Sequence, residues 1–150
     1  MSTHEHHVDV DVPVRSAYDQ WTQFEEVPRF MEGVERVEHR GDEHLHWVVS
    51  IAGTTREFDT VINEQRPGQR IAWTTIDGPR HAGVVTFHKL TDTSARVTLQ
   101  MEYAPDGLIE HVGDKAGFVS RRVEGDMDRF KEFIEERLTP TGAWRGEIDR

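Results

Sequence analysis

The last third of the chain carries an apolar stripe with helical spacing. Apolar residues recur there at steps of three and four, which is the period of one face of an α-helix. They are Val112, Ala116, Val119, Val123, Met127, Phe130, Ile134 and Leu138. The spacing predicts one helix of roughly eight turns over 112–138. Its apolar face must be buried, and the middle of the chain is the only large partner.

The middle of the chain alternates between apolar and polar residues, with short turns between the alternating runs. Such alternation is typical of strands that are buried on one face. The expected strands cover residues 33–39, 44–51, 55–65, 70–76, 81–90 and 95–103. Each connection is only a few residues long, which favours antiparallel pairing of neighbours in a meander.

The first part of the chain predicts one more strand and two short helical pieces. Valine alternates with aspartate over residues 6–12, as in a half-buried strand. Pro13 suits the first turn of a helix that would continue to Trp21. A dense apolar segment, Phe24 to Met31, contains Pro28 and is expected to fold over an edge of the sheet.

This order of elements predicts an α+β protein with one domain over residues 1–139. A curved antiparallel sheet of about seven strands would wrap round the C-terminal helix, since one helix and one sheet must bury each other's apolar faces. Beyond Thr139 the chain contains Pro140, Gly142, Gly146 and scattered charges. Residues 140–150 are therefore expected to form a flexible tail.

Composition excludes several classes of function. The formal net charge is -10, from 28 acidic and 18 basic residues, and no basic run is present. We therefore expect no nucleic-acid partner. The absence of cysteine excludes disulfides and thiolate chemistry. Without a signal-peptide pattern or a long apolar run, we expect no stable membrane insertion and a cytoplasmic location.

The inward faces of the expected sheet and helix combine large apolar side chains with a few polar ones. This composition is typical of a small-molecule site, although an aromatic stripe on a strand more often belongs to a packed core. The candidate ligand-binding residues are Met31, Trp47, Phe58, Thr60, Trp73, Thr75, Phe87, Met101, Phe118 and Arg122.

Several short motifs resemble the START-like, helix-grip superfamily. They are VDVDVP at 8–13, AYDQW at 17–21, FEEVPRFM at 24–31, RIAW at 70–73, GVVTF at 83–87 and the helix at 123–138. The later ones are similar to the polyketide cyclase/dehydrase branch, which also contains coenzyme-Q-binding proteins. The resemblance implies a seven-stranded sheet gripping the C-terminal helix, with a cavity for lipids, polyketides, isoprenoid quinones or hormones. It implies no single chemistry, because its members include binders, carriers and a minority of cyclases and aromatases.

Catalytic signals are sparse. The sequence contains no G-x-S-x-G, H-E-x-x-H, phosphate-binding glycine loop or dinucleotide fingerprint. His44 and His46 share one face of a strand, but no third metal ligand can be named beside them. We therefore predict neither a metal nor another cofactor.

Three functions are compatible with these patterns. The preferred one is binding or carriage of a small hydrophobic ligand, such as a lipid, an isoprenoid quinone or a polyketide, which reaches its site past the Phe24 to Met31 segment. The first alternative is a cyclase or aromatase in which Arg56, Thr60, Thr75 or Tyr103 polarises a carbonyl. The second is a protein-interaction module that docks a partner on the Phe24 to Met31 segment. We expect a binding protein rather than an enzyme.

Overall fold

The computed structural model describes residues 2–51, 53–77, 81–103 and 115–149. The elements are β1 (Ser2–Val10), α1 (Val14–Trp21), the 3-10 helix η1 (Phe24–Arg29), β2 (Val34–His39), β3 (His44–Ile51), β4 (Thr54–Arg66), β5 (Arg70–Asp77), β6 (His81–Thr91), β7 (Ser94–Tyr103), α2 (Lys115–Arg137) and β8 (Ile148–Asp149). The predicted order of strand, two short helices, strands and long helix is confirmed.

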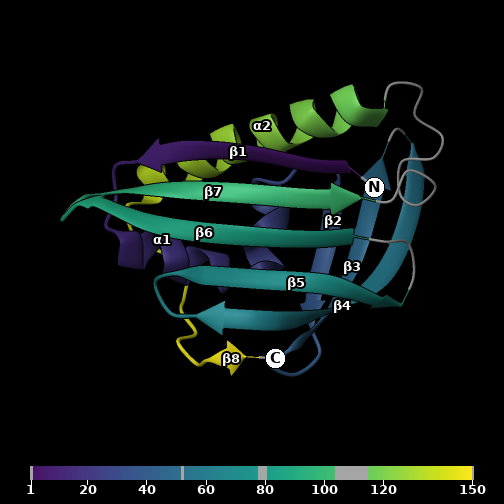
Figure 1. Cartoon of the computed structure of the whole chain (residues 1–150), viewed down its shortest axis with the longest axis horizontal. Coiled ribbons are helices and arrows are strands. Elements are labelled where there is room, and N and C mark those ends of the chain that lie inside the picture. Colours follow the sequence, from purple (N-terminus) through teal and green to yellow (C-terminus); the bar gives the residue numbers. More distant parts are fainter. Residues whose placement is uncertain (1, 52, 78–80, 104–114, 150) are drawn as a thin grey trace.

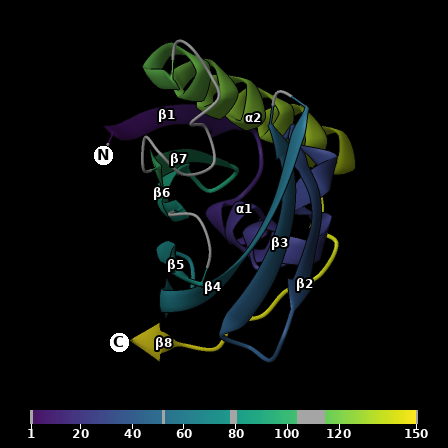
Figure 2. The same cartoon turned by 90° about the vertical axis from the view of Figure 1, so that its right-hand side faces the viewer.

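The strands form one antiparallel sheet in the order β1-β7-β6-β5-β4-β3-β2, with β8 added to β4. Strands β2 to β7 make the predicted meander, and β1 pairs with β7 along its whole length. The sheet curls into a half-barrel; α1 lies inside the curl, and α2 runs beside β1 across its open side (Figures 1 and 2). This arrangement confirms the predicted α+β helix-grip fold.

Alternation along each strand decides which side chains form the core. In β7, Val97, Leu99 and Met101 are buried on the concave face, while Arg96 and Thr98 lie on the outer face. Because successive strand side chains point to opposite faces, the concave side of the sheet is almost continuously apolar. That side positions the aromatic residues of the candidate site.

The Phe24 to Met31 segment packs into the core instead of forming an exposed surface. The ring of Phe30 lies 5.2 Å from Trp21 and 5.1 Å from Phe130, measured between centroids. Phe24, Phe30 and Met31 each expose 4% or less of their surface. The hypothesis of a protein partner docking on this segment lacks the exposed apolar patch that it requires, because the segment's apolar side chains are used to close the end of the half-barrel.

Helix α2 follows the predicted stripe for most of its length. Val119, Val123, Met127, Phe130 and Ile134 are buried. The expected start at Val112 and the side chain of Ala116 lie outside the described part of the chain. Leu138 is 62% exposed and has a left-handed backbone φ of 65°, so it follows the helix end and does not extend the buried stripe.

The segment after α2 lies against the domain, which differs from the free tail expected from the sequence. Gln20 Nε2 donates to Thr141 Oγ1 at 2.9 Å, and the Thr141 backbone N–H donates to Gln20 Oε1 at 2.8 Å. Ile148 is buried, and β8 pairs with residues 64–65 of β4. Ile148, the partly buried Trp144 and the paired hydrogen bonds between Gln20 and Thr141 hold this segment. None of these contacts produces a periodic sequence pattern.

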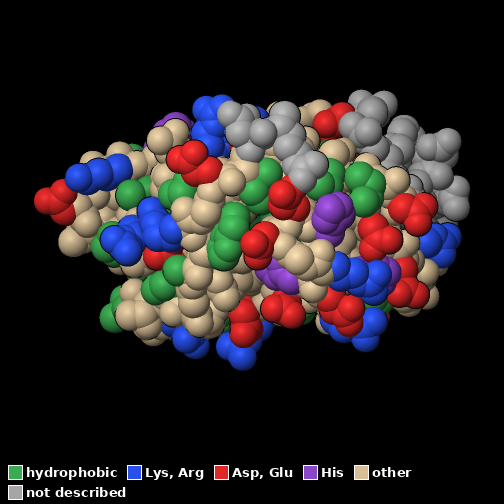
Figure 3. Space-filling model, turned by 90° about the horizontal axis from the view of Figure 1, so that it is seen from below, with side chains coloured by type: hydrophobic (Ala, Val, Ile, Leu, Met, Phe, Trp, Pro, Cys, Tyr) green, Lys and Arg blue, Asp and Glu red, His purple; other side chains and the backbone are tan. Residues whose placement is uncertain are grey.

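On the face seen in Figure 3, acidic and basic side chains are interspersed over the described residues. None of the described helices combines the length and the apolar character needed to cross a bilayer.

Candidate functional site

Four rings meet on the concave face of the sheet. Trp47, Phe58, Trp73 and His81 come from the adjacent strands β3, β4, β5 and β6, and we refer to them as the aromatic group. Trp47 stacks on Phe58 and on Trp73, each at 5.9 Å between ring centroids. The His81 ring meets Phe58 edge-on at 4.8 Å and Trp47 at 5.1 Å. Such offset and edge-on contacts are the favoured geometries of aromatic pairs.

Strand register explains why these rings converge. Trp47 is directly opposite Phe58, and Trp73 is directly opposite Gly83. A Cβ atom at Gly83 would overlap the Trp73 indole. Because Gly83 has no side chain, the Trp73 indole can pack directly against the backbone of β6 at this position.

Both threonines predicted at the site support the aromatic group. Trp47 Nε1 donates a hydrogen bond of 2.8 Å to Thr60 Oγ1. Thr75 Oγ1 accepts from the His81 backbone N–H and donates to the His81 carbonyl oxygen, each at 2.6 Å. Among the described residues, Trp73 Nε1 is buried without a hydrogen-bond partner. A buried donor of this kind normally finds a partner, so the Trp73 N–H can still donate a hydrogen bond to a ligand.

His81 is the functional candidate that the sequence predictions missed. It is 3% exposed, and burial lowers the pKa of its imidazole to about 3. The ring is therefore neutral at pH 7, where it can donate or accept a hydrogen bond but is a weak base. Alternation along β6 places His81 on the same face as Gly83, Val85 and Phe87, and this signal could have identified it.

The predicted ligand-binding residues lie in three separate parts of the structure: around the aromatic group, elsewhere in the core, and on α2. Trp47, Phe58 and Trp73 come together with Thr60 and Thr75 around the aromatic group. Met31, Phe87 and Met101 are buried elsewhere in the same core, and Phe87 packs edge-on against Tyr18 at 5.3 Å. Phe118 and Arg122 lie on α2 beside Glu32. A ligand-lining role for these residues stays a prediction.

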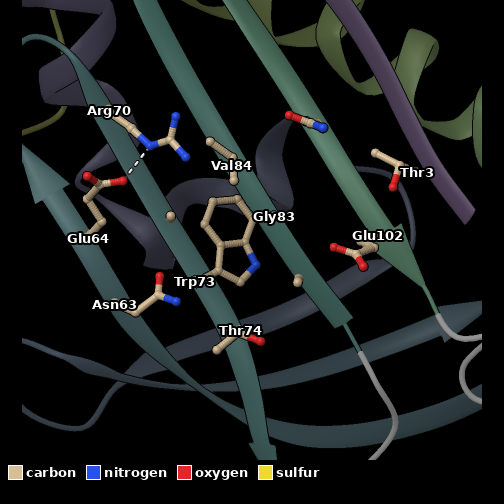
Figure 4. A pocket seen from close by; sticks show the side chains of 12 residues that line it. Thr3, Asn63, Glu64, Arg70, Trp73, Thr74, Gly83, Val84 and Glu102 are labelled. Atoms are coloured by element: carbon tan, nitrogen blue, oxygen red, sulfur yellow. Dashed lines mark hydrogen bonds and ion pairs between the residues drawn. The ribbon is translucent and has the colours of Figure 1, made fainter. Parts of the chain in front are cut away.

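A depression lies on the outer face of the sheet, and Trp73 is the one predicted ligand-binding residue among those that line it. It has a volume of about 490 Å³ and spans β4, β5, β6, β7 and β1 (Figure 4). Small side chains, Thr74, Ala82 and Val84, contribute to its lining, and Arg70 pairs with Glu64 beside them. This polar-edged depression lacks the apolar walls expected of a hydrophobic site.

The link between η1 and β2 is fastened to α2. The Glu32 backbone N–H donates to Asp126 Oδ1 at 2.9 Å, and Arg129 Nε donates to the Phe30 carbonyl at 3.0 Å. Burial raises the pKa of Asp126 to about 6, although Arg129 and the Glu32 N–H act against this shift. These contacts hold the C-terminal end of the predicted access segment against α2.

The other residues predicted to take part in chemistry are Arg56 and Tyr103. Arg56 is half-buried and its Nη1 donates to the Thr55 carbonyl at 3.3 Å. The side chain of Tyr103 lies outside the described part of the chain. Over residues 2–51, 53–77, 81–103 and 115–149, no three His, Asp or Glu side chains gather in a metal-binding cluster.

The half-barrel, the long helix across its open side and the aromatic concave face define a START-like, helix-grip fold. The chain belongs to the family described as polyketide cyclase / dehydrase and lipid transport, whose model matches residues 10–132. It is also 55% identical over 149 residues to an uncharacterized 17.2 kDa protein of Streptomyces lincolnensis, with 99% of each chain covered.

Solved structures share the fold at low sequence identity. ZhuI aromatase/cyclase from Streptomyces sp. R1128 is 17% identical, with a TM-score of 0.74 over 95% of this chain and 99% of that one. A Deinococcus radiodurans protein is 21% identical, with a TM-score of 0.74 over 91% and 99% of the two chains. A START superfamily protein from Mycobacterium smegmatis is 14% identical, with a TM-score of 0.66 over 91% and 96%.

Proposed function

We propose that this protein binds or carries a small hydrophobic molecule between the sheet and α2, against the aromatic group. The single observation that carries the proposal is the convergence of Trp47, Phe58, Trp73 and His81 on the concave face. Membership of a family described as acting in lipid transport and polyketide chemistry supports the same assignment.

The chemistry of the aromatic group favours a ligand that is largely apolar and carries an oxygen acceptor. Stacked rings offer apolar surface, whose removal from water contributes about 25 cal/mol per Å². The Trp73 Nε1–H is a donor without a partner in the described structure. Isoprenoid quinones and aromatic polyketides combine an apolar body with carbonyl oxygens, so they suit this site better than a pure hydrocarbon.

The polar groups around the site favour binding over proton transfer. A general base is most effective when its pKa lies near the working pH, whereas the pKa of His81 is about 3. The Thr75 hydroxyl is engaged by the His81 backbone, and the Thr60 hydroxyl accepts from Trp47. A cyclase function would therefore depend on positioning of the substrate rather than on these groups as acids or bases.

The first test is native mass spectrometry of protein purified from its own cells, followed by extraction of any bound molecule. A stoichiometric quinone, lipid or polyketide would support the proposal and supply the compound for turnover assays. The binding site is then tested by tryptophan fluorescence titration with that compound, or with a panel of quinones, fatty acids and aromatic polyketides if none is extracted.

Matched variants locate the binding site. Phe58→Leu removes a ring from the aromatic group, whereas Phe133→Leu removes a half-buried ring from α2. We expect Phe58→Leu to weaken ligand binding roughly fivefold or more, as loss of about 1 kcal/mol of aromatic contact implies. Phe133→Leu should leave binding unchanged. Equal effects of the two variants, or failure of the whole panel to bind, would refute the proposal.

A further inference from the structure

A small groove rich in arginine lies where α2 meets the link between η1 and β2. It has a volume of about 200 Å³ and is lined by Glu32, Phe118, Arg121, Arg122 and Arg129. We refer to it as the arginine groove. Three arginines and one carboxylate line the groove, and a second carboxylate, that of Asp126, pairs with Arg129 beside it, in a chain whose formal net charge is -10. This local excess of positive charge opposes the charge of the whole molecule.

Two of the guanidinium groups are held in fixed positions by the protein itself. Arg122 Nη1 donates to the Glu32 carbonyl at 2.7 Å, and the Arg122 guanidinium carbon lies 4.9 Å from the centroid of the Phe118 ring. Arg129 Nε donates to the Phe30 carbonyl at 3.0 Å, and its Nη2 pairs with Asp126. Fixing these side chains in advance lowers the entropy lost when they bind an anion.

The Glu32 carboxylate lies between these two guanidinium groups but bonds to neither. Its Oε1 is 3.6 Å from Arg122 Nη2, and its Oε2 is 3.7 Å from Arg129 Nη1. Both distances exceed those of a hydrogen bond. The Glu32 side chain is also 65% exposed. An exposed ion pair of this kind contributes little, so another oxyanion can displace the carboxylate at low cost.

We propose that the arginine groove binds an oxyanion, a carboxylate or a phosphate, in the place that the Glu32 carboxylate occupies in this structure. Arg122 Nη2 and Arg129 Nη1 converge on that place from two sides, and guanidinium groups match the planar, multiply accepting geometry of carboxylate and phosphate oxygens. Arg121 is exposed at the same groove and adds a third positive charge. The proposal does not depend on the function proposed for the aromatic group.

The oxyanion has two chemical sources, a free anion or the acidic head group of an amphipathic molecule. Phe118 lines the arginine groove and also packs against the hydrophobic core. An apolar chain attached to the anion would therefore find apolar surface directly beside the guanidinium groups. Inorganic phosphate and decanoate represent the two sources, and decanol is the matched neutral control for the second.

The experiment follows the arginine Nε–Hε signals by NMR at low ionic strength during titration with phosphate, decanoate and decanol. We expect phosphate or decanoate to shift the Arg122 and Arg129 signals, and we expect decanol not to shift them. A response to phosphate alone indicates a free anion, whereas a stronger response to decanoate indicates an acidic amphipath; either result supports an oxyanion site.

Variants at exposed positions test the assignment without disturbing the fold. Glu32→Gln removes the competing carboxylate and should tighten anion binding roughly two- to fivefold, while Arg121→Gln should weaken it by a similar factor, as expected for exposed charge pairs. Arg137→Gln, an exposed position in the last turn of the same helix, is the control. The proposal is overturned if neither anion shifts the two arginine signals, or if Glu32→Gln and Arg121→Gln bind as Arg137→Gln does.

Discussion

The Trp73 indole lies over Gly83, its direct partner on β6, in the space that a side chain at Gly83 would fill. The same indole stacks on Trp47 and meets Phe24 edge-on at 5.5 Å. The absence of one side chain thus fixes the position of a large ring in the aromatic group.

Gly83→Ala should destabilise the protein because its methyl group would overlap the Trp73 ring. Overpacking of a core by one methyl group typically costs about 1–3 kcal/mol. The loss is measured as the change in the free energy of unfolding in urea. In the background of Trp73→Leu, which removes the overlapping ring, the cost of Gly83→Ala should fall to well under half. Additive effects of the two substitutions would contradict the close contact.

His81 should make stability depend on pH in the acid range. Burial lowers the pKa of folded His81 from 6.5 to about 3, so between these values the unfolded chain binds a proton that the folded chain does not. Stability is fully present above pH 6.5 and falls as the pH drops, by up to about 1.4 kcal/mol per pH unit from this group.

The His81→Gln variant tests this origin of the acid sensitivity. Its stability should change less than that of the wild type between pH 6.5 and 4.5, when both are followed by urea unfolding at each pH. An NMR titration of the wild type should detect no protonation of the His81 ring above pH 4.5. If the variant and the wild type have the same pH slope, His81 does not remain neutral in the folded protein.

The sequence predicts the strands that local alternation and turn residues define, but not the pairing of strands that lie far apart in the chain. Residues 44–51 form a strand with the predicted bounds because Leu45, Trp47 and Val49 recur at every second position and glycines with positive φ stand at 41 and 53. The pairing of β1 with β7 joins residues that are between 85 (Val10 and Ala95) and 101 (Ser2 and Tyr103) positions apart. No local pattern indicates such a pairing, and it was not predicted from the sequence.

The sequence predicted which side chains of the candidate site point inward, but not how they contact one another. Alternation correctly placed Trp47, Phe58 and Trp73 on the concave side, yet it could not show that Thr75 bonds the His81 backbone. It also could not distinguish a ring that lines a cavity from a ring that fills the core, since both point inward. That distinction depends on the volumes of side chains contributed by other strands and helices.

The C-terminal segment should contribute measurably to stability. Ile148 is 6% exposed, and burial of one such side chain contributes about 1.5–3 kcal/mol. Ile148→Ala should therefore lower the free energy of unfolding by about 2 kcal/mol. Ile76→Ala, at a position that is 56% exposed, is the matched control and should change it by less than about 0.5 kcal/mol.

Removal of residues 141–150 tests the same contact and the predicted domain boundary together. We expect the shortened chain to fold, with a melting temperature lower than that of the full chain. If its melting temperature and its hydrogen exchange in β4 are unchanged, the segment behaves as the free tail that the sequence suggested.

His46 should affect stability in the opposite pH direction from His81. Its Nδ1 lies 2.7 Å from Asp59 Oδ1, and its Nε2 lies 2.9 Å from Glu57 Oε1. Two hydrogen bonds raise the pKa of His46 above 6.5: the one to Asp59 has the larger effect, and the one to Glu57 has the smaller effect. The protonated ring therefore stabilises the folded chain fully below pH 6.5, and this contribution is lost as the pH rises through the folded-state pKa.

The comparison of His46→Gln with His44→Gln isolates this contribution. His44 lies exposed on the same strand, so its replacement controls for the loss of a histidine from that face. The wild type and His44→Gln should both lose stability as the pH rises above 6.5, whereas His46→Gln should lose less. Because the hydrogen bond to the Asp59 carboxylate is the largest cause of the raised pKa, Asp59→Asn should lower the His46 pKa measured by NMR. An unchanged pKa in that variant would show that the Asp59 carboxylate does not hold the proton on His46.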